Sequence, residues 1–173
     1  MDQSFMKTRP VLPLVVSMSM PMVLSMLVNA LYNIVDSFFI AKISENAMTA
    51  LSLVFPLQNI IGAVCIGFGV GVNAAVAFYL GAQRKKDADG AASLGVLLSL
   101  VHAVFLTVLL SLAVRPFLSA FTKDPEVLDY GIRYARIVIL FSVINQVSLV
   151  YEKLFQAIGS MKVSMVSMMA GCI

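Results

Sequence analysis

Charged residues are scarce in this sequence, and their scarcity limits the class of protein that it can encode. Only 12% of its 173 residues are Asp, Glu, Lys or Arg, against about 25% in an average soluble domain. Hydrophobic residues make up 60% of the chain, and the mean hydropathy is +0.95. A soluble domain of this length still exposes much of its surface to water. The composition therefore excludes an ordinary soluble domain and predicts a protein embedded in the lipid bilayer.

Cysteine and histidine are also nearly absent. Cys65 and Cys172 both lie in apolar runs, which favours packing as small hydrophobic side chains and excludes a disulfide framework. His102 is the single histidine, and we interpret it as a hydrogen-bonded structural residue. No metal-ligand spacing is present, so we predict no metal site.

Catalytic motifs are missing as well. The sequence contains no Ser/His/Asp set and no P-loop. The glycine-rich stretch Gly67–Gly71 is not a dinucleotide fingerprint, because no strand precedes it and no carboxylate follows at the required distance. We therefore predict that the protein is not an enzyme and has no cofactor. The net charge of +3 is too small to indicate a nucleic-acid partner.

Long apolar runs dominate the chain. A helix needs about 20 such residues to cross the hydrocarbon core, and four segments qualify: residues 12–40, 47–80, 91–121 and 127–158. A fifth begins at residue 161 and is still apolar at residue 173. We expect an all-α, polytopic transmembrane bundle with four full spans and the start of a fifth. The short connections predict that sequential helices are antiparallel neighbours. The apolar ending predicts that residues 1–173 are an incomplete lobe that is inactive alone.

The distribution of Lys and Arg predicts the orientation. Six lie in the N-terminal tail and in the loops after the second and fourth spans, namely Lys7, Arg9, Arg84, Lys85, Lys86 and Lys162. The opposite side carries Lys42, Arg115 and Lys123, with Arg133 and Arg136 in the first turns of the fourth span. Because cytoplasmic loops carry the excess of cations, we expect a multi-pass protein of the inner (plasma) membrane with a cytoplasmic N-terminus.

Asp36 is the most informative single position, since it lies inside the first apolar run. A carboxylate at the centre of a membrane helix costs about 2.5–3.5 kcal/mol on insertion scales. Such a residue is a candidate for exchanging a proton or a cation. The alternative is a carboxylate near the helix end whose side chain reaches the membrane interface.

Amide side chains accompany Asp36. Asn29 and Asn33 precede it at spacings that place all three on one helix face with Ser25, close to Tyr32. A polar stripe on an apolar helix is expected to face a bundle interior or a water-filled cavity. Further cavity-lining candidates are Gln58 and Asn73 in the second span and Asn145 and Gln146 in the fourth. The alternative is interhelical hydrogen bonding without a transport role.

The second span contains Gly62, Gly67, Gly69 and Gly71. These glycines predict a surface for close packing and hinge motion, because small residues let two helices approach each other closely. In the fourth span Glu152 adjoins Lys153. We interpret this pair as a local ion pair or an interfacial anchor.

Several segments resemble one known family. Leu31–Ala41 resembles the first-helix motif of multidrug and toxic compound extrusion (MATE) transporters. Gly67–Ala74 with Leu80–Ala82 is similar to the family's second helix and its exit loop. Phe155–Gly159 resembles the end of the fourth helix, and residues 161–173 the opening of the fifth. The resemblance covers nearly the whole chain, in order.

The resemblance implies a twelve-helix antiporter of two six-helix lobes that exports organic cations, including drugs, in exchange for H⁺ or Na⁺. It implies that Asp36 takes part in cation coupling, and that the remainder of the protein, beyond residue 173, supplies the second lobe. Two alternatives stay open. One is a flippase-like exporter of a lipid-linked substrate from the same superfamily, which cavity-facing basic residues would favour. The other is a non-transporting membrane scaffold, against which the polar stripe of the first span argues.

Overall fold

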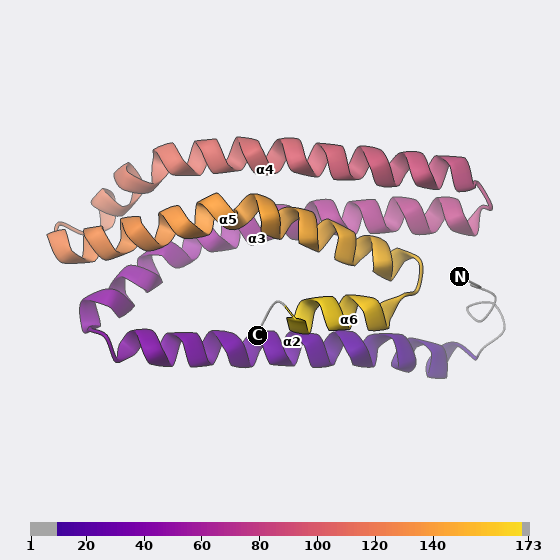
Figure 1. Cartoon of the computed structure of the whole chain (residues 1–173), viewed down its shortest axis with the longest axis horizontal. Coiled ribbons are helices and arrows are strands. Elements are labelled where there is room, and N and C mark those ends of the chain that lie inside the picture. The colour runs from indigo at the N-terminus through magenta and orange to yellow at the C-terminus, as the bar shows by residue number, and fades with distance from the viewer. Residues whose placement is uncertain (1–9, 171–173) are drawn as a thin grey trace.

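The chain folds into long helices joined by short loops (Figure 1), as a computed structural model that describes residues 10–170 shows. The helices are α2 (Val11–Ala41), α3 (Glu45–Gly81), α4 (Lys85–Phe121), α5 (Pro125–Ala157) and α6 (Met161–Ala170). Four of them, α2 to α5, are long and apolar enough to cross a membrane. The predicted all-α transmembrane bundle is confirmed. Cys172 and the basic residues Lys7 and Arg9 lie outside the described residues.

The observed helix bounds agree with the predicted spans except at α4. This helix begins at Lys85, six residues before the predicted apolar segment at residue 91. The charged residues between them form its first turns, with Asp87 near the positive end of the helix dipole. Apolar runs mark the part of a helix inside the hydrocarbon, so they miss turns that project beyond it.

Side chains fix two of the helix starts. The Ser44 hydroxyl accepts a hydrogen bond from the Ala47 backbone N–H at 3.0 Å. Asp124 Oδ1 accepts from the backbone N–H groups of Glu126 and Val127 at 2.8 and 3.3 Å, and Pro125 occupies the first turn of α5. Both arrangements satisfy amides that have no partner inside the helix. These two loops therefore have defined geometry, which fixes the reversal of the chain at the end of the bundle that they share, where Asn46 Nδ2 donates to Glu126 Oε2 at 2.7 Å.

Helices α3, α4 and α5 pack together into the core of the structure. Each presents a buried stripe whose members recur every three or four residues, as one face of a helix does. The main cluster comprises Val54, Leu57, Ile61, Cys65, Leu110, Val114, Leu118, Ala135 and Ile139. Cys65 thus packs as a small hydrophobic residue, in agreement with the sequence-based interpretation.

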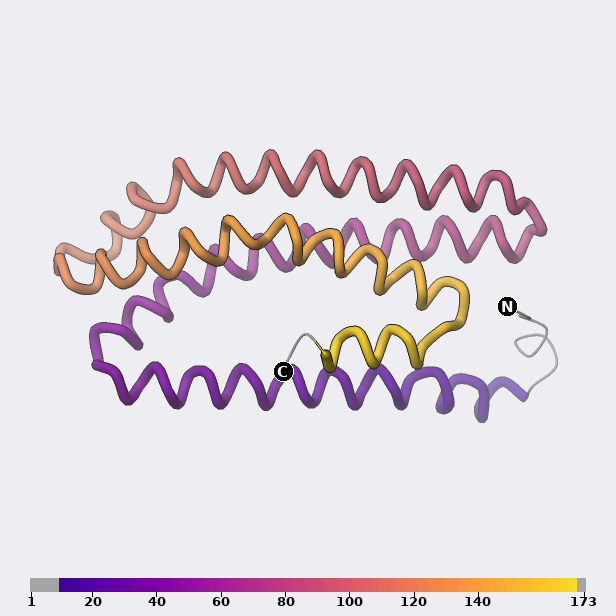
Figure 2. Tube along the Cα trace, viewed as in Figure 1, coloured from indigo at the N-terminus to yellow at the C-terminus, as the bar shows by residue number. Residues whose placement is uncertain are grey.

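Helix α2 stands apart from this core (Figures 1 and 2). It meets α3 at their connecting loop and then diverges from it, while the short α6 packs against α2 and α5. Ser25 is the one buried residue of α2, all of which the structure describes. The expectation that sequential helices are close neighbours is therefore wrong for most of the α2–α3 pair. The divergence leaves space between α2 and α5, and the polar side chains of both helices line it.

Candidate functional site

An open cavity of about 860 Å³ lies between α2 and α5, and α6 and Ile66 of α3 also contribute to its lining. Its volume falls within the range of about 300–1,000 Å³ typical of small-molecule sites. Apolar side chains cover most of its wall, with a few polar groups among them, as in most ligand pockets. The polar lining residues are Asn29, Asn33, Asn145, Ser148, Glu152 and Ser167, and the apolar ones include Met26, Phe141, Ile144 and Met168.

The α2 wall of the cavity carries two linked amides. Asn33 Nδ2 donates to the backbone carbonyl oxygen of Asn29 at 2.8 Å and to its Oδ1 at 3.2 Å. The two residues are one helical turn apart, which is why their side chains meet. Their remaining oxygen lone pairs are available to a ligand in the cavity.

The α5 wall carries polar groups at spacings of three and four residues, namely Asn145, Ser148 and Glu152. Among the contacts of residues 10–170, the Asn145 side chain makes no hydrogen bond and is exposed toward this space. An amide with both donor and acceptor free can serve either side of a hydrogen bond. Asn145 is therefore available to a ligand, and so is the exposed Ser148, which likewise makes no side-chain hydrogen bond among the described residues.

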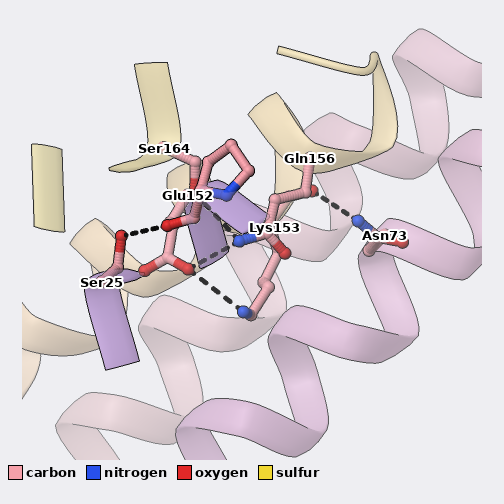
Figure 3. Close-up of polar contacts among 7 residues, drawn as sticks. Ser25, Asn73, Glu152, Lys153, Gln156 and Ser164 are labelled. Atoms are coloured by element: carbon pink, nitrogen blue, oxygen red, sulfur yellow. Dashed lines mark hydrogen bonds and ion pairs between the residues drawn. The ribbon is translucent and has the colours of Figure 1, made fainter. Parts of the chain in front are cut away.

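Glu152 forms the centre of a polar network at one end of the cavity (Figure 3). Its Oε1 accepts from Lys153 Nζ at 3.1 Å and from Gln156 Nε2 at 2.7 Å, and Gln156 Nε2 also lies 2.9 Å from Ser164 Oγ on α6. Asn73 of α3 donates to the Lys153 carbonyl oxygen at 2.7 Å. The network therefore joins α3, α5 and α6.

The ion pair between Glu152 and Lys153 is more buried than the sequence indicated. The side chains of Glu152 and Lys153 are only 15% and 17% exposed. The predicted local ion pair is confirmed, but an interfacial anchor would point into water, and Glu152 instead lines the cavity. Asn145, Ser148 and Glu152 recur at spacings of three and four residues, and this pattern is the sequence signal that could have indicated an inward-facing Glu152.

Asp36 lies one turn beyond Asn33, towards the loop that joins α2 to α3, and is partly exposed. It is not among the residues that line the cavity. Asp36 and Tyr32 lie close enough to Tyr134 of α5 to interact with it electrostatically, and the Tyr134 hydroxyl accepts a hydrogen bond from Gln58 Nε2 at 3.0 Å. Within the described residues Asp36 has no salt bridge and no hydrogen bond of its own side chain. It therefore belongs to a second polar group near the cavity.

The other cavity-lining candidates lie outside this cavity. Tyr32 is 51% exposed, and it lies near Tyr134 of α5 and not in the cavity lining. Gln58 and Asn73 face α5, through the hydrogen bonds to Tyr134 and to the Lys153 backbone. Gln146 is buried in the α3–α5 core, where its Nε2 has no hydrogen-bond partner in the described structure.

The glycines of α3 divide into two groups. Gly69 lies at a close approach to α5, since a Cβ there would stand 2.8 Å from Lys153 Cγ and 3.0 Å from Leu149 Cδ2. Gly62, Gly67 and Gly71 have nothing within 4 Å of a Cβ position. Close packing therefore involves Gly69 alone among these four positions.

His102 makes the contacts expected of a structural histidine. Its Nδ1 lies 2.9 Å from the Leu98 carbonyl oxygen, and its ring packs against Phe68.

Comparison with known proteins identifies the family to which this chain belongs. The sequence profile of the MatE family matches residues 21–173. The chain is 26% identical over 152 residues to an FAD transporter of Shewanella oneidensis, covering 84% of this chain and 34% of that protein. It is 27% identical over 153 residues to the multidrug export protein MepA of Staphylococcus haemolyticus, covering 88% of this chain and 34% of that protein.

Solved structures show the same arrangement of helices. A transporter of the MOP superfamily from Pyrococcus furiosus superposes with a TM-score of 0.88 at 28% identity, over 92% of this chain and 35% of that one. The chain thus spans about a third of the length of the relatives it matches. Profile, relatives and fold agree that this multi-pass membrane protein belongs to the MatE family, the multidrug and toxic compound extrusion transporters.

Proposed function

We propose that this chain forms part of the N-terminal lobe of a secondary antiporter, which exports organic cations in exchange for H⁺ or Na⁺. The observation that carries the proposal is the composition of the cavity between α2, α5 and α6. Its lining contains amides, hydroxyls, a carboxylate and apolar side chains, and neither Lys nor Arg. Family membership and the multidrug export relatives support the same class of function.

The cavity favours a cationic and partly apolar substrate. Phe141, Met26 and Met168 offer aromatic and polarizable surface, and aromatic faces attract organic cations while Met adapts to varied shapes. Asn145 and the paired amides of α2 supply oxygen acceptors. An organic cation thus finds both apolar contact and partial negative charge within one space.

An anionic substrate fits the cavity less well. One relative is named an FAD transporter, and a substrate with phosphate groups would call for Lys or Arg in the lining. Lys153 is already paired with Glu152. The flippase-like alternative also depended on cavity-facing basic residues, and the lining residues and the relatives do not favour it.

Asn145 provides the direct test of the cavity. Asn145→Leu keeps approximate size but removes a free amide from the wall, so the full-length protein should export an organic cation more slowly. The expected loss is about tenfold if one hydrogen bond or cation contact of roughly 1.4 kcal/mol disappears. Efflux of a fluorescent lipophilic cation from cells that express equal amounts of each variant measures it.

Asn59→Leu is the matched control, since Asn59 is an exposed amide of α3 outside the cavity lining. Equal efflux from the Asn145→Leu and wild-type proteins would show that the exported substrate does not bind in this cavity. A loss of equal size in both variants would point to membrane insertion instead of substrate contact.

The predicted orientation leads to a labelling experiment. In a background without Cys65 and Cys172, single cysteines are placed at Ile43 and Gln83, in the loops at opposite ends of α3. Since the Arg84–Lys86 segment is predicted to face the cytoplasm, a membrane-impermeant maleimide added to intact cells should label position 43 and spare position 83. Ile43 is 66% exposed, so access to its loop is not limited by packing. The reverse pattern would place the N-terminus outside.

A further inference from the structure

A second large cavity lies on the far side of the core from the transport cavity, as a groove between α3 and α4. Its volume is about 900 Å³. It contains no residue of α2, α5 or α6, so it is separate from the proposed substrate site. On α4 it extends from Lys86 to Leu98, which corresponds to about 18 Å along a helix axis. Half of the hydrocarbon core measures about 15 Å, so the groove spans one leaflet.

The floor of the groove is open because glycine forms it. A Cβ at Gly67, Gly71 or Gly90 would meet nothing within 4 Å. Apart from the end at Lys86 and Asp87, the lining is apolar. Phe68 lies near the other end of the groove and packs against His102, with ring centroids 4.5 Å apart. The shape and lining fit a flexible hydrocarbon chain.

The opposite end of the groove is cationic. Lys86 lines it and makes no ion pair with any residue that the structure describes. Asp87 lines it too, but Arg84 Nε neutralises that carboxylate at 2.7 Å while its guanidinium lies over the Tyr79 ring. Arg84 at the N-cap position of α4 makes no side-chain cap hydrogen bond, and the backbone N–H of Asp87 donates to the Arg84 carbonyl oxygen at 3.1 Å, so the backbone N–H groups of Lys85 and Lys86 are the ones also available to an anion.

We propose that this groove binds an anionic phospholipid, with one acyl chain between α3 and α4 and the phosphate at Lys86 and the start of α4. Charge complementarity selects this occupant. A zwitterionic phospholipid brings its own cation next to its phosphate, which weakens the attraction of that phosphate to Lys86. An apolar protein helix, about 10 Å wide, would cover Lys86 without neutralising it. Anionic lipids are enriched at the cytoplasmic surface, where the basic loop is predicted to lie.

The experiment uses the full-length protein in nanodiscs. Phosphatidylglycerol and phosphatidylcholine, each carrying the same diazirine in the acyl chain, are present at the same mole fraction in separate preparations. After photolysis, labelled peptides are mapped by mass spectrometry. We expect phosphatidylglycerol to label residues 64–79 and 86–98 about fivefold more than phosphatidylcholine does, the factor that one lysine contributes at an anionic membrane surface.

Variants separate the headgroup contact from the chain contact. Lys86→Gln should reduce labelling by phosphatidylglycerol to the level of phosphatidylcholine, whereas Lys85→Gln, the same charge change outside the groove lining, should leave most of it. Gly71→Leu should reduce labelling by both lipids, and Gly62→Leu, also at an open position but outside the groove, should not. Ala75→Leu, a second substitution in the lining, replaces Gly71→Leu if that variant misfolds.

Three results would overturn the proposal. Equal labelling of the groove by both lipids would show that the groove does not select an anionic headgroup. Equal effects of Lys85→Gln and Lys86→Gln would show that the basic loop attracts anionic lipid only diffusely, without a specific contact at Lys86. Labelling that avoids residues 64–79 and 86–98 with both lipids would mean that another part of the protein covers the groove.

Discussion

Asp36→Asn is expected to reduce gradient-driven export by the full-length protein to the level of vesicles without it. The substitution keeps the size and hydrogen-bonding capacity of the side chain and removes its titratable charge. The variant should therefore reach the membrane and bind substrate while losing its response to an ion gradient. Export from vesicles with an imposed H⁺ or Na⁺ gradient measures the effect, and comparing the two gradients in the wild-type protein identifies the coupling ion.

The position of Asp36 gives the physical reason. A charged carboxylate costs about 2.5–3.5 kcal/mol at the centre of a membrane helix and less near the helix end where Asp36 lies, and binding of a proton or a cation relieves that cost. No Lys or Arg of the described chain forms a salt bridge with Asp36, so an external ion can act as its partner. Nearby Tyr134 and Gln58 belong to α5 and α3. A change of charge at Asp36 would therefore alter how α2 sits against the core, and so bias one of two conformations.

Glu45→Gln is the control for this experiment. Glu45 is the nearest carboxylate in the sequence, but it is exposed in the first turn of α3, beyond the end of the first span. Its charge already faces water, so its removal should leave export nearly unchanged. If the Asp36→Asn protein exported at the wild-type rate, Asp36 would be an interfacial anchor and the coupling carboxylate would have to be sought elsewhere.

Gly95→Ala is expected to destabilise the fold by about 1–3 kcal/mol, the usual cost of inserting a methyl group at a tightly packed contact. A Cβ at Gly95 would clash with Val72 Cγ2 and lie 2.9 Å from Val72 Cγ1. Valine is stiff about χ1, so either Val72 adopts an unfavourable rotamer or α3 and α4 separate, and both cost free energy. Thermal unfolding of the purified full-length protein in one detergent measures the loss as a lower Tm.

A glycine on the same helix provides the comparison. Gly90→Ala adds the same methyl group where nothing lies within 4 Å, and Ala favours a helix by up to about 1 kcal/mol over Gly, so the Tm should stay or rise. Adding Val72→Ala to Gly95→Ala should restore part of the stability, with a coupling energy of about 1 kcal/mol or more in the double-mutant cycle. Equal Tm values for Gly90→Ala and Gly95→Ala would show that α3 and α4 adjust without cost.

The amino-acid sequence by itself determined the number of spans, the class of fold and the start of α5. These features depend on local chemistry. An apolar run of sufficient length must cross the bilayer as a helix, since only a helix satisfies its own backbone there. The Asp124–Pro125 pair begins α5 whatever packs against it. The polar stripe of α2 could likewise be predicted from the sequence, because helical periodicity decides which side chains share a face.

Only the tertiary structure decided which faces meet. In a membrane the lipid tails are as apolar as leucine, so an apolar helix face does not specify its neighbour. For that reason the divergence of α2 from α3, the burial of Glu152 between α5 and α6, and the position of Asn145 rather than Gln146 on the cavity wall could not be derived from the pattern. Close contacts such as Gly95 against Val72, and the open groove beside Gly71 and Gly90, depend on how far two helix axes stand apart. That distance is set by packing across helices distant in sequence, which periodicity along one helix does not encode.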